Sequence, residues 1–314
     1  MRVFVAGATG VIGRSLVPAL IAAGHEVTAM TRSPEKTSAL GGAGCTPVVC
    51  DAFDAAALDA AVRAAEPDVI INELTDLPSS FSPRAMASAY ETTSRLRTEA
   101  MRTLIDAGAT SGAKRVIAQS IAFLYAPEGA AVQEEDGRPF TEAPPPFGDA
   151  VRAVVQMEAL VTSIPGIDGL VLRYGALYGP GTWYAAGGST AEALWRRRYP
   201  VVGDGGGVFS FIHVDDAAAA TVAAVAGGAP GVYNIVDDEP APMRDWLPVY
   251  AKALGAPAPR RVPAWLARLA AGRAATEMAT SLRGASNAKA KRELGWRPRY
   301  ASWRTGFPED LASG

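Results

Sequence analysis

Short apolar runs alternate with stretches of helical periodicity along most of the chain. Such runs are typical of parallel strands covered on both faces, and right-handed crossovers between them place helices on both sides. The pattern predicts an α/β fold with a Rossmann-type doubly wound parallel sheet. The predicted strands are Arg2–Ala6, Glu26–Met30, Thr46–Val49, Asp68–Ile71, Arg115–Gln119, Gly169–Arg173, Phe209–Val214 and Val232–Val236. The predicted helices are Val11–Ala23, Asp54–Ala65, Pro83–Ala107, Asp149–Ser163 and Asp215–Ala226.

This alternation breaks after Arg173, where the sequence becomes rich in glycine, proline and tryptophan. Two later stretches return to it, and the remainder mixes short helices with prolines. We therefore predict a main domain from residues 1–174 and 207–236. A smaller C-terminal lobe is predicted from residues 175–206 and 237–314, packed where the strands end.

Composition narrows the class of protein. Of 314 residues, 49% are hydrophobic, and the net charge of −2 argues against a partner that is nucleic acid or an anionic membrane. No apolar run reaches the ~18 residues of a membrane span, and no signal peptide is expected. Cys45 and Cys50 predict no disulfide framework, and two histidines offer too few ligands for a metal site. We expect a cytoplasmic protein.

The strongest motif follows the first predicted strand directly. It reads GATGVIG at residues 7–13 and opens a helix. Gly7 permits the tight turn, Gly10 lets the backbone approach a pyrophosphate, and Gly13 allows close packing of helix on strand. Free amides at the start of the helix stabilise phosphate charge. The motif predicts a dinucleotide cofactor.

The end of the second strand indicates which nicotinamide cofactor binds. An acidic residue there would accept a hydrogen bond from the ribose of NAD. The chain instead has Arg32, Ser33 and Lys36, which suit a 2′-phosphate. NADP(H) is therefore the preferred cofactor, with NAD(H) as the alternative. Asp51, after the third strand, is placed to accept a hydrogen bond from the adenine amino group or to cap the next helix.

Several segments together resemble the extended branch of the short-chain dehydrogenase/reductase superfamily, the NAD-dependent epimerase/dehydratase type. They are residues 7–14, 172–181, 203–218, 232–240 and 287–298. The resemblance implies a Rossmann domain for the cofactor, a C-terminal lobe for a small-molecule substrate and a homodimer joined by the two long helices. The predicted cofactor-binding residues are Gly7, Thr9, Gly10, Val11, Ile12, Gly13, Arg32, Ser33, Lys36, Asp51, Ala52, Leu74, Thr75, Gln119, Tyr174, Gly175 and Ala176.

The acid–base pair of this family, Tyr-x-x-x-Lys, is missing from the expected place. Alignment on Phe147 puts Phe147 and Val151 in the two positions, and alignment on Glu158 puts Ala150 and Val154 there. The candidates that remain for proton exchange are Tyr125, Ser120 and Tyr178. Tyr125 is equally compatible with a packing role. His213, Asp149 and Glu142 are weaker candidates, and Glu73 is an unusual acid after the fourth strand.

Three functions are compatible with these observations. The first is an NAD(P)-dependent oxidoreductase acting on a small carbonyl, alcohol or sugar-like substrate with a nonstandard proton donor. The second is a lyase or isomerase that keeps a bound nicotinamide cofactor. The third is a binding protein that senses NADP. The dimer is predicted from an apolar stripe along Ala85, Ala89, Leu96, Val151, Val155 and Leu160.

Overall fold

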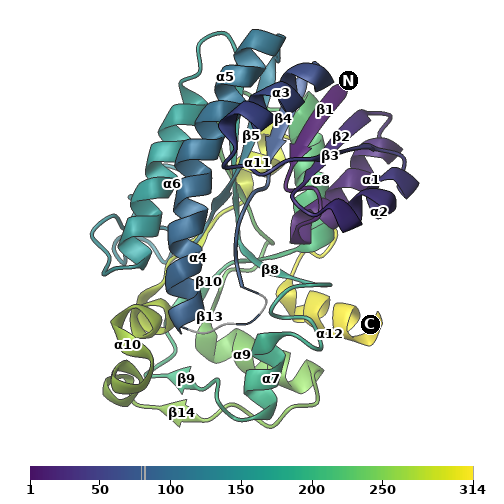
Figure 1. Ribbon diagram of the computed structural model, residues 1–314. Coiled ribbons are helices and arrows are strands. Elements are labelled where there is room, and N and C mark those ends of the chain that lie inside the picture. The colour runs from purple at the N-terminus through teal and green to yellow at the C-terminus, as the bar shows by residue number, and fades with distance from the viewer. Residues whose placement is uncertain (79, 81–82, 314) are drawn as a thin grey trace.

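A seven-stranded parallel sheet forms the centre of the computed structural model, which describes residues 1–78, 80 and 83–313 (Figure 1). The strand order is β12-β7-β5-β4-β1-β2-β3, so the chain winds outward from β1 in both directions and the predicted doubly wound fold is confirmed. The strands are β1 (Arg2–Ala6), β2 (Glu26–Thr31), β3 (Thr46–Val49), β4 (Val69–Asn72), β5 (Arg115–Ile121), β7 (Asp168–Tyr174) and β12 (Gly231–Ile235).

Two layers of helices cover this sheet. On one face α1 (Val11–Ala22) packs against α8 (Val214–Ala226). The other face carries α3 (Ala55–Ala65), α4 (Pro83–Arg95), α5 (Met101–Ser111) and α6 (Phe147–Thr162), with α4 and α6 side by side in Figure 1. Central strands such as β4 are buried along their whole length, which explains their uninterrupted apolar sequences.

The long helix predicted over Pro83–Ala107 is present and changes its winding part-way along. Between α4 and α5 the chain forms one turn of π-helix, η2 (Leu96–Ala100). A π-turn contains one more residue than an ordinary helical turn. The sequence of this turn contains no glycine or proline that would have predicted it. The helical stretch predicted over Pro83–Ala107 is therefore confirmed, and the π-turn within it was not predicted.

The single strand predicted over Phe209–Val214 is also different. It consists of β10 (Val208–Phe209) and β11 (Phe211–His213). The first pairs with β13 (Ala241–Pro242) and the second with β8 (Ala176–Tyr178), so neither joins the central sheet. Ser210 lies between them, and it accepts hydrogen bonds from the Ala176 amide at its carbonyl oxygen and from the Ala285 amide at its hydroxyl.

The C-terminal elements gather at the end of the molecule below the sheet (Figure 1). They include α7 (Ser189–Trp195), α9 (Met243–Ala253), α10 (Ala264–Ser281) and α12 (Trp303–Ser313). A separate aromatic core around Tyr178, Trp246 and Phe307 holds them together. The predicted division into two lobes stays a prediction. Among the described residues, no helix is long and apolar enough to span a bilayer.

Candidate active site

The glycine-rich turn after β1 cannot accommodate side chains. Gly7 has φ of +90°, and a Cβ atom there would lie 2.8 Å from the carbonyl carbon of Glu73. A Cβ atom on Gly13 would lie 2.4 Å from the Gly7 oxygen. The turn and the start of α1 are thus packed directly on β4, which brings backbone rather than side chains to the edge of the sheet.

The start of α1 is open to an anion. Gly10 is its N-cap and provides no side-chain hydrogen bond, and the first turn, which includes Val11 and Ile12, has no acidic residue. The free amides and the helix dipole are therefore not neutralised by the protein. Thr9 stabilises the turn from the side, since its hydroxyl lies 3.4 Å from that of Thr31. These features fit the pyrophosphate of a dinucleotide.

The cationic residues after β2 are at the surface. The Arg32 side chain is 74% exposed and forms an ion pair with Asp76 at 3.3 Å. The Ser33 amide donates to the Thr31 hydroxyl, and Lys36 is exposed at the end of a short 3₁₀ helix. An exposed ion pair contributes little to stability. Arg32 can therefore release Asp76 and bind a phosphate group instead.

Asp51 lies at the end of β3 with an exposed carboxylate. It accepts a hydrogen bond from the Phe53 amide at 2.9 Å, whereas Asp54 caps α3 by accepting from the Ala57 amide. The alternative that Asp51 caps this helix is therefore wrong, and its contact with adenine stays a prediction. The neighbouring Ala52 is buried.

The other predicted cofactor residues follow β4, β5 and β7, whose ends meet at this edge of the sheet. The Leu74 amide donates to Asn72, just before Thr75, and the Gln119 side chain donates to the Ser120 carbonyl oxygen. Gly175 has no room for a side chain, because a Cβ atom would lie 2.6 Å from the Ser210 oxygen. It is followed directly by Ala176. Their contacts with cofactor stay predictions.

A buried acid lies beneath the glycine turn. Glu73 is 7% exposed, and burial raises its pKa to about 8, with the Tyr174 hydroxyl partly opposing this effect. The Tyr174 hydroxyl lies 2.9 Å from Glu73 Oε1 and 2.6 Å from the Thr221 hydroxyl, which donates to the Ala217 carbonyl oxygen. The Tyr174 side chain therefore points into the α8 face of the sheet, and only its backbone lies at the site.

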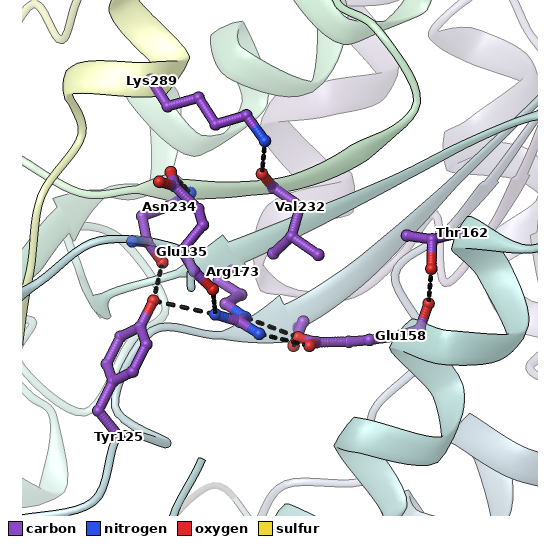
Figure 2. Close-up of polar contacts among 9 residues, drawn as sticks. Tyr125, Glu135, Glu158, Thr162, Arg173, Val232, Asn234 and Lys289 are labelled. Carbon is purple, nitrogen blue, oxygen red and sulfur yellow. Dashed lines mark hydrogen bonds and ion pairs between the residues drawn. The ribbon is translucent and has the colours of Figure 1, made fainter. Parts of the chain in front are cut away.

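Tyr125 belongs to a buried ionic network with Arg173 and Glu158 (Figure 2), and Ser120 contacts the same network. Ser120 donates to Glu158 at 2.6 Å, and the Arg173 guanidinium contacts both oxygens of the same carboxylate at 2.6 and 2.8 Å. Arg173 also donates to the Tyr125 hydroxyl, which donates to Asn234 at 2.7 Å. Both hydroxyls are therefore engaged in hydrogen bonds that connect β5 and the segment after it to α6, β7 and β12.

Tyr178 lies in the aromatic core of the C-terminal part. It is fully buried between His213 and Phe307, and its hydroxyl has no partner among the described residues. Burial raises its pKa further above the ordinary value for tyrosine. His213 accepts from the Asp215 amide and lies 3.4 Å from Asp310, which are contacts of an anchor between α8 and α12.

The helix α6 presents an apolar surface where an acid–base pair was expected. None of its residues, all of them described, is a tyrosine or a lysine, and Phe147, Ala150, Val151 and Val154 are buried. Phe147 also lines a small pocket whose walls are mainly apolar. The exposed acids Asp149 and Glu142 form ion pairs with Arg152 and Arg138. The placements of Ser120, Tyr125 and Tyr178 favour structural roles, and their catalytic assignment stays an untested prediction.

Two residues of the neighbouring helix were missed by sequence reasoning. Tyr90 of α4 and Arg97 of η2 face α6, and Arg97 is 6% exposed. A signal was present, because Met86, Thr93 and Ala100 share the buried face on which Arg97 lies. An arginine on that face is unusual.

The chain is similar to a known protein family over most of its length. The model of the NAD dependent epimerase/dehydratase family matches residues 3–236. The chain belongs to this family. The predicted resemblance is confirmed. The protein is an enzyme of the oxidoreductase or epimerase class that this family contains, and it uses a nicotinamide cofactor.

Curated relatives extend over most of the chain. A 3-diazoavenalumate denitrifying reductase from Streptomyces sp is 48% identical over 310 residues, 98% of this chain and 99% of the relative. A 2-alkyl-3-oxoalkanoate reductase from Stenotrophomonas maltophilia is 24% identical, over 82% of this chain and 77% of its own.

Solved structures share the fold. The UDP-glucose 4-epimerase of Thermotoga maritima, solved with UDP-glucose, has a TM-score of 0.77 at 20% identity and covers 99% of this chain and 98% of its own. The human epimerase family protein SDR39U1, solved with NADPH, has a TM-score of 0.74 at 21% identity, with both chains fully covered. At these identities the likeness concerns the fold alone.

Proposed function

We propose that this enzyme is a reductase that replaces the diazo group of an aromatic carboxylic acid by hydrogen, using NADPH. The relative with 48% identity over nearly the whole chain is named for reduction of a diazo acid with loss of nitrogen. The observation that carries the proposal is the apolar surface of α6, which has neither tyrosine nor lysine.

The reaction explains why such a surface is sufficient. Bound NADPH supplies a hydride. In a diazonium substrate the hydride electron pair forms the new C–H bond, and the C–N bonding pair leaves with N₂. Atoms and charge balance without a proton, so the site needs no acid such as the Tyr-Lys pair that carbonyl reduction requires. The side chains of Phe147, Val151 and Val154 would exclude water from the cation, with which water also reacts.

The pocket beside Phe147 is small, and its apolar walls favour contact with an aromatic ring. Its lining includes Phe123, Phe140, Met278 and Leu282 together with the acid Glu277, and it contains no lysine or arginine. A nucleotide sugar would need cationic partners for its pyrophosphate, whereas a planar aromatic acid gains from contact with aromatic rings.

The first prediction follows the hydride. With 3-diazoavenalumate and NADPH deuterated at C4, we expect one N₂ for each NADPH oxidised and deuterium on the carbon that carried the diazo group. Mass spectrometry of the product measures this. Tyr125→Phe keeps the ring and removes only the hydroxyl, so turnover should stay within about threefold of the unmodified enzyme. A loss of about 10²–10⁴-fold would instead identify Tyr125 as a general acid.

The second prediction concerns cofactor preference. The exposed Arg32 and Lys36, with Ser33 between them, should bind the 2′-phosphate of NADPH, giving about tenfold tighter binding than NADH. Arg32→Ala should remove most of this difference, and fluorescence titration of both cofactors measures it. Arg102→Ala, which removes an exposed arginine from α5, is the control. Equal affinities in the unmodified enzyme would contradict the proposal.

We further propose a cytoplasmic homodimer in which α4 and α6 lie at the interface. The half-buried Ala85, Val155 and Leu160 support it. Ala89, Leu96 and Val151 do not support it, because they are buried within the chain itself.

The proposed cytoplasmic location is compatible with the two cysteines, which are free and buried, as expected in a reducing compartment.

A further inference from the structure

A cationic group without a partner lies between the two long helices. Arg97 is 6% exposed, and its Nε atom is buried without a hydrogen bond. Among the described residues, no acceptor forms a hydrogen bond or an ion pair with its side chain. A buried guanidinium is normally paired, since removing the charge from water without compensation is costly.

The nearest acid does not compensate this charge. Glu158 of α6 is close enough to favour the charged form of Arg97, but both of its oxygens are held by Arg173 and Ser120. Two arginines therefore share one carboxylate in this part of the interior. Burial lowers the pKa of Arg97 to about 10, which leaves it charged at neutral pH.

A second polar group is available beside it. Tyr90 lies two turns before Arg97 on the same helical face, and its hydroxyl has no hydrogen bond among the described residues. The spacing along the helix puts Arg97 on the same side as this phenol, and its positive charge partly opposes the rise of the Tyr90 pKa that burial causes. Burial raises the pKa of Tyr90, so the hydroxyl keeps its proton as a hydrogen-bond donor.

This helical face lies beside the segment that follows β4 and beside Phe147. Thr93, between Tyr90 and Arg97, accepts from the Asp76 amide at 3.1 Å in the segment that follows β4. The Tyr90 ring lies 6.4 Å from the ring of Phe147, which lines the pocket. The π-turn η2 includes Arg97, and such turns are frequent at functional sites.

We propose that Arg97 and Tyr90 form the subsite that binds the carboxylate of the substrate, with its aromatic part against Phe147. The inference rests on the proposed function and specifies how the site recognises an organic acid. A carboxylate accepts two parallel N–H bonds from a guanidinium and a third bond from the phenol. The substrate carboxylate also supplies the negative charge that balances the buried guanidinium of Arg97.

Binding and stability of the NADP⁺-loaded enzyme test this subsite, with cinnamate as the planar aromatic carboxylate and cinnamamide as its neutral counterpart. Arg97→Met should weaken cinnamate binding about 10- to 100-fold in calorimetric titration and leave cinnamamide unchanged. The melting temperature without ligand should stay equal or rise, because an unpaired buried charge is removed. Tyr90→Phe should weaken cinnamate binding several-fold.

The control is Arg102→Met, which removes an exposed arginine from the next helical turn and should change neither quantity. Unchanged cinnamate affinity in Arg97→Met, equal losses for cinnamate and cinnamamide, or a lower melting temperature would overturn the proposal. Binding of UDP-glucose in place of cinnamate would overturn it too. If the enzyme releases no N₂ from a diazo acid while cinnamate binding still depends on Arg97, the proposed function fails and the subsite stands.

Discussion

Replacing Arg173 by methionine is expected to lower the free energy of unfolding by about 3–5 kcal/mol, because it leaves a buried carboxylate without its cation. The Arg173 and Glu158 side chains are 5% and 8% exposed and are joined at 2.6 Å. The same guanidinium donates to the Tyr125 hydroxyl and to the Glu135 carbonyl oxygen, so its loss also leaves these acceptors without a donor (Figure 2). The midpoint of urea unfolding measures the change.

Two further variants distinguish the contribution of the Arg173–Glu158 ion pair from that of side-chain packing. Arg152→Met removes an exposed cation that pairs with Asp149 on α6, and should change stability by less than about 1 kcal/mol. The double variant Arg173→Met with Glu158→Leu removes both buried charges and should be more stable than Arg173→Met alone. A double variant no more stable than the single one would show that the network contributes through packing rather than charge.

The sequence predicted the central sheet well because its signals are local. Each buried strand is a short apolar run, and the glycine spacing at Gly7, Gly10 and Gly13 is required by close backbone contacts with Glu73 and Ala8. The break at Ser210 and the π-turn of η2 were missed, since both depend on which distant segments the chain packs against.

The site was harder to predict for the same reason. Ser120 and Tyr125 follow a strand that ends near the cofactor, which made them reasonable candidates for proton exchange. What occupies their hydroxyls is Glu158, 38 residues away from Ser120, and Asn234, 109 residues away from Tyr125. Contacts over such separations have no signature in a single sequence. Arg97 did have a sequence signal, an arginine on an otherwise largely apolar helical face, but its lack of a partner for the buried charge is visible only in the structure.

Glu73 illustrates how a proton can be part of the folded structure. Its contact with Tyr174, the contact of Tyr174 with Thr221 and the hydrogen bond from Thr221 to Ala217 are three successive bonds. The two hydroxyls supply only two hydrogens. All three bonds form together only when Glu73 is protonated, which agrees with the pKa of about 8 that burial gives it.

Stability should therefore fall as the pH rises through this pKa. The folded state holds a proton that the unfolded chain, with an ordinary pKa of 4.5, has released, so the contribution is complete below pH 4.5 and is lost by about pH 8. The difference between the two pKa values, 4.5 and about 8, corresponds to on the order of 5 kcal/mol at ~1.4 kcal/mol per pH unit.

Glu73→Gln keeps the shape and a permanent donor, so it should unfold at higher urea concentration than the unmodified protein at pH 8.5 and at a similar concentration at pH 5. Unfolding midpoints measured across this range check the slope, and Glu91→Gln on exposed α4 is the control. Parallel pH profiles for Glu73→Gln and the unmodified protein would mean that Glu73 is ionised in the fold. In that case Tyr174 would donate to the carboxylate and Thr221 would lose one of its two contacts.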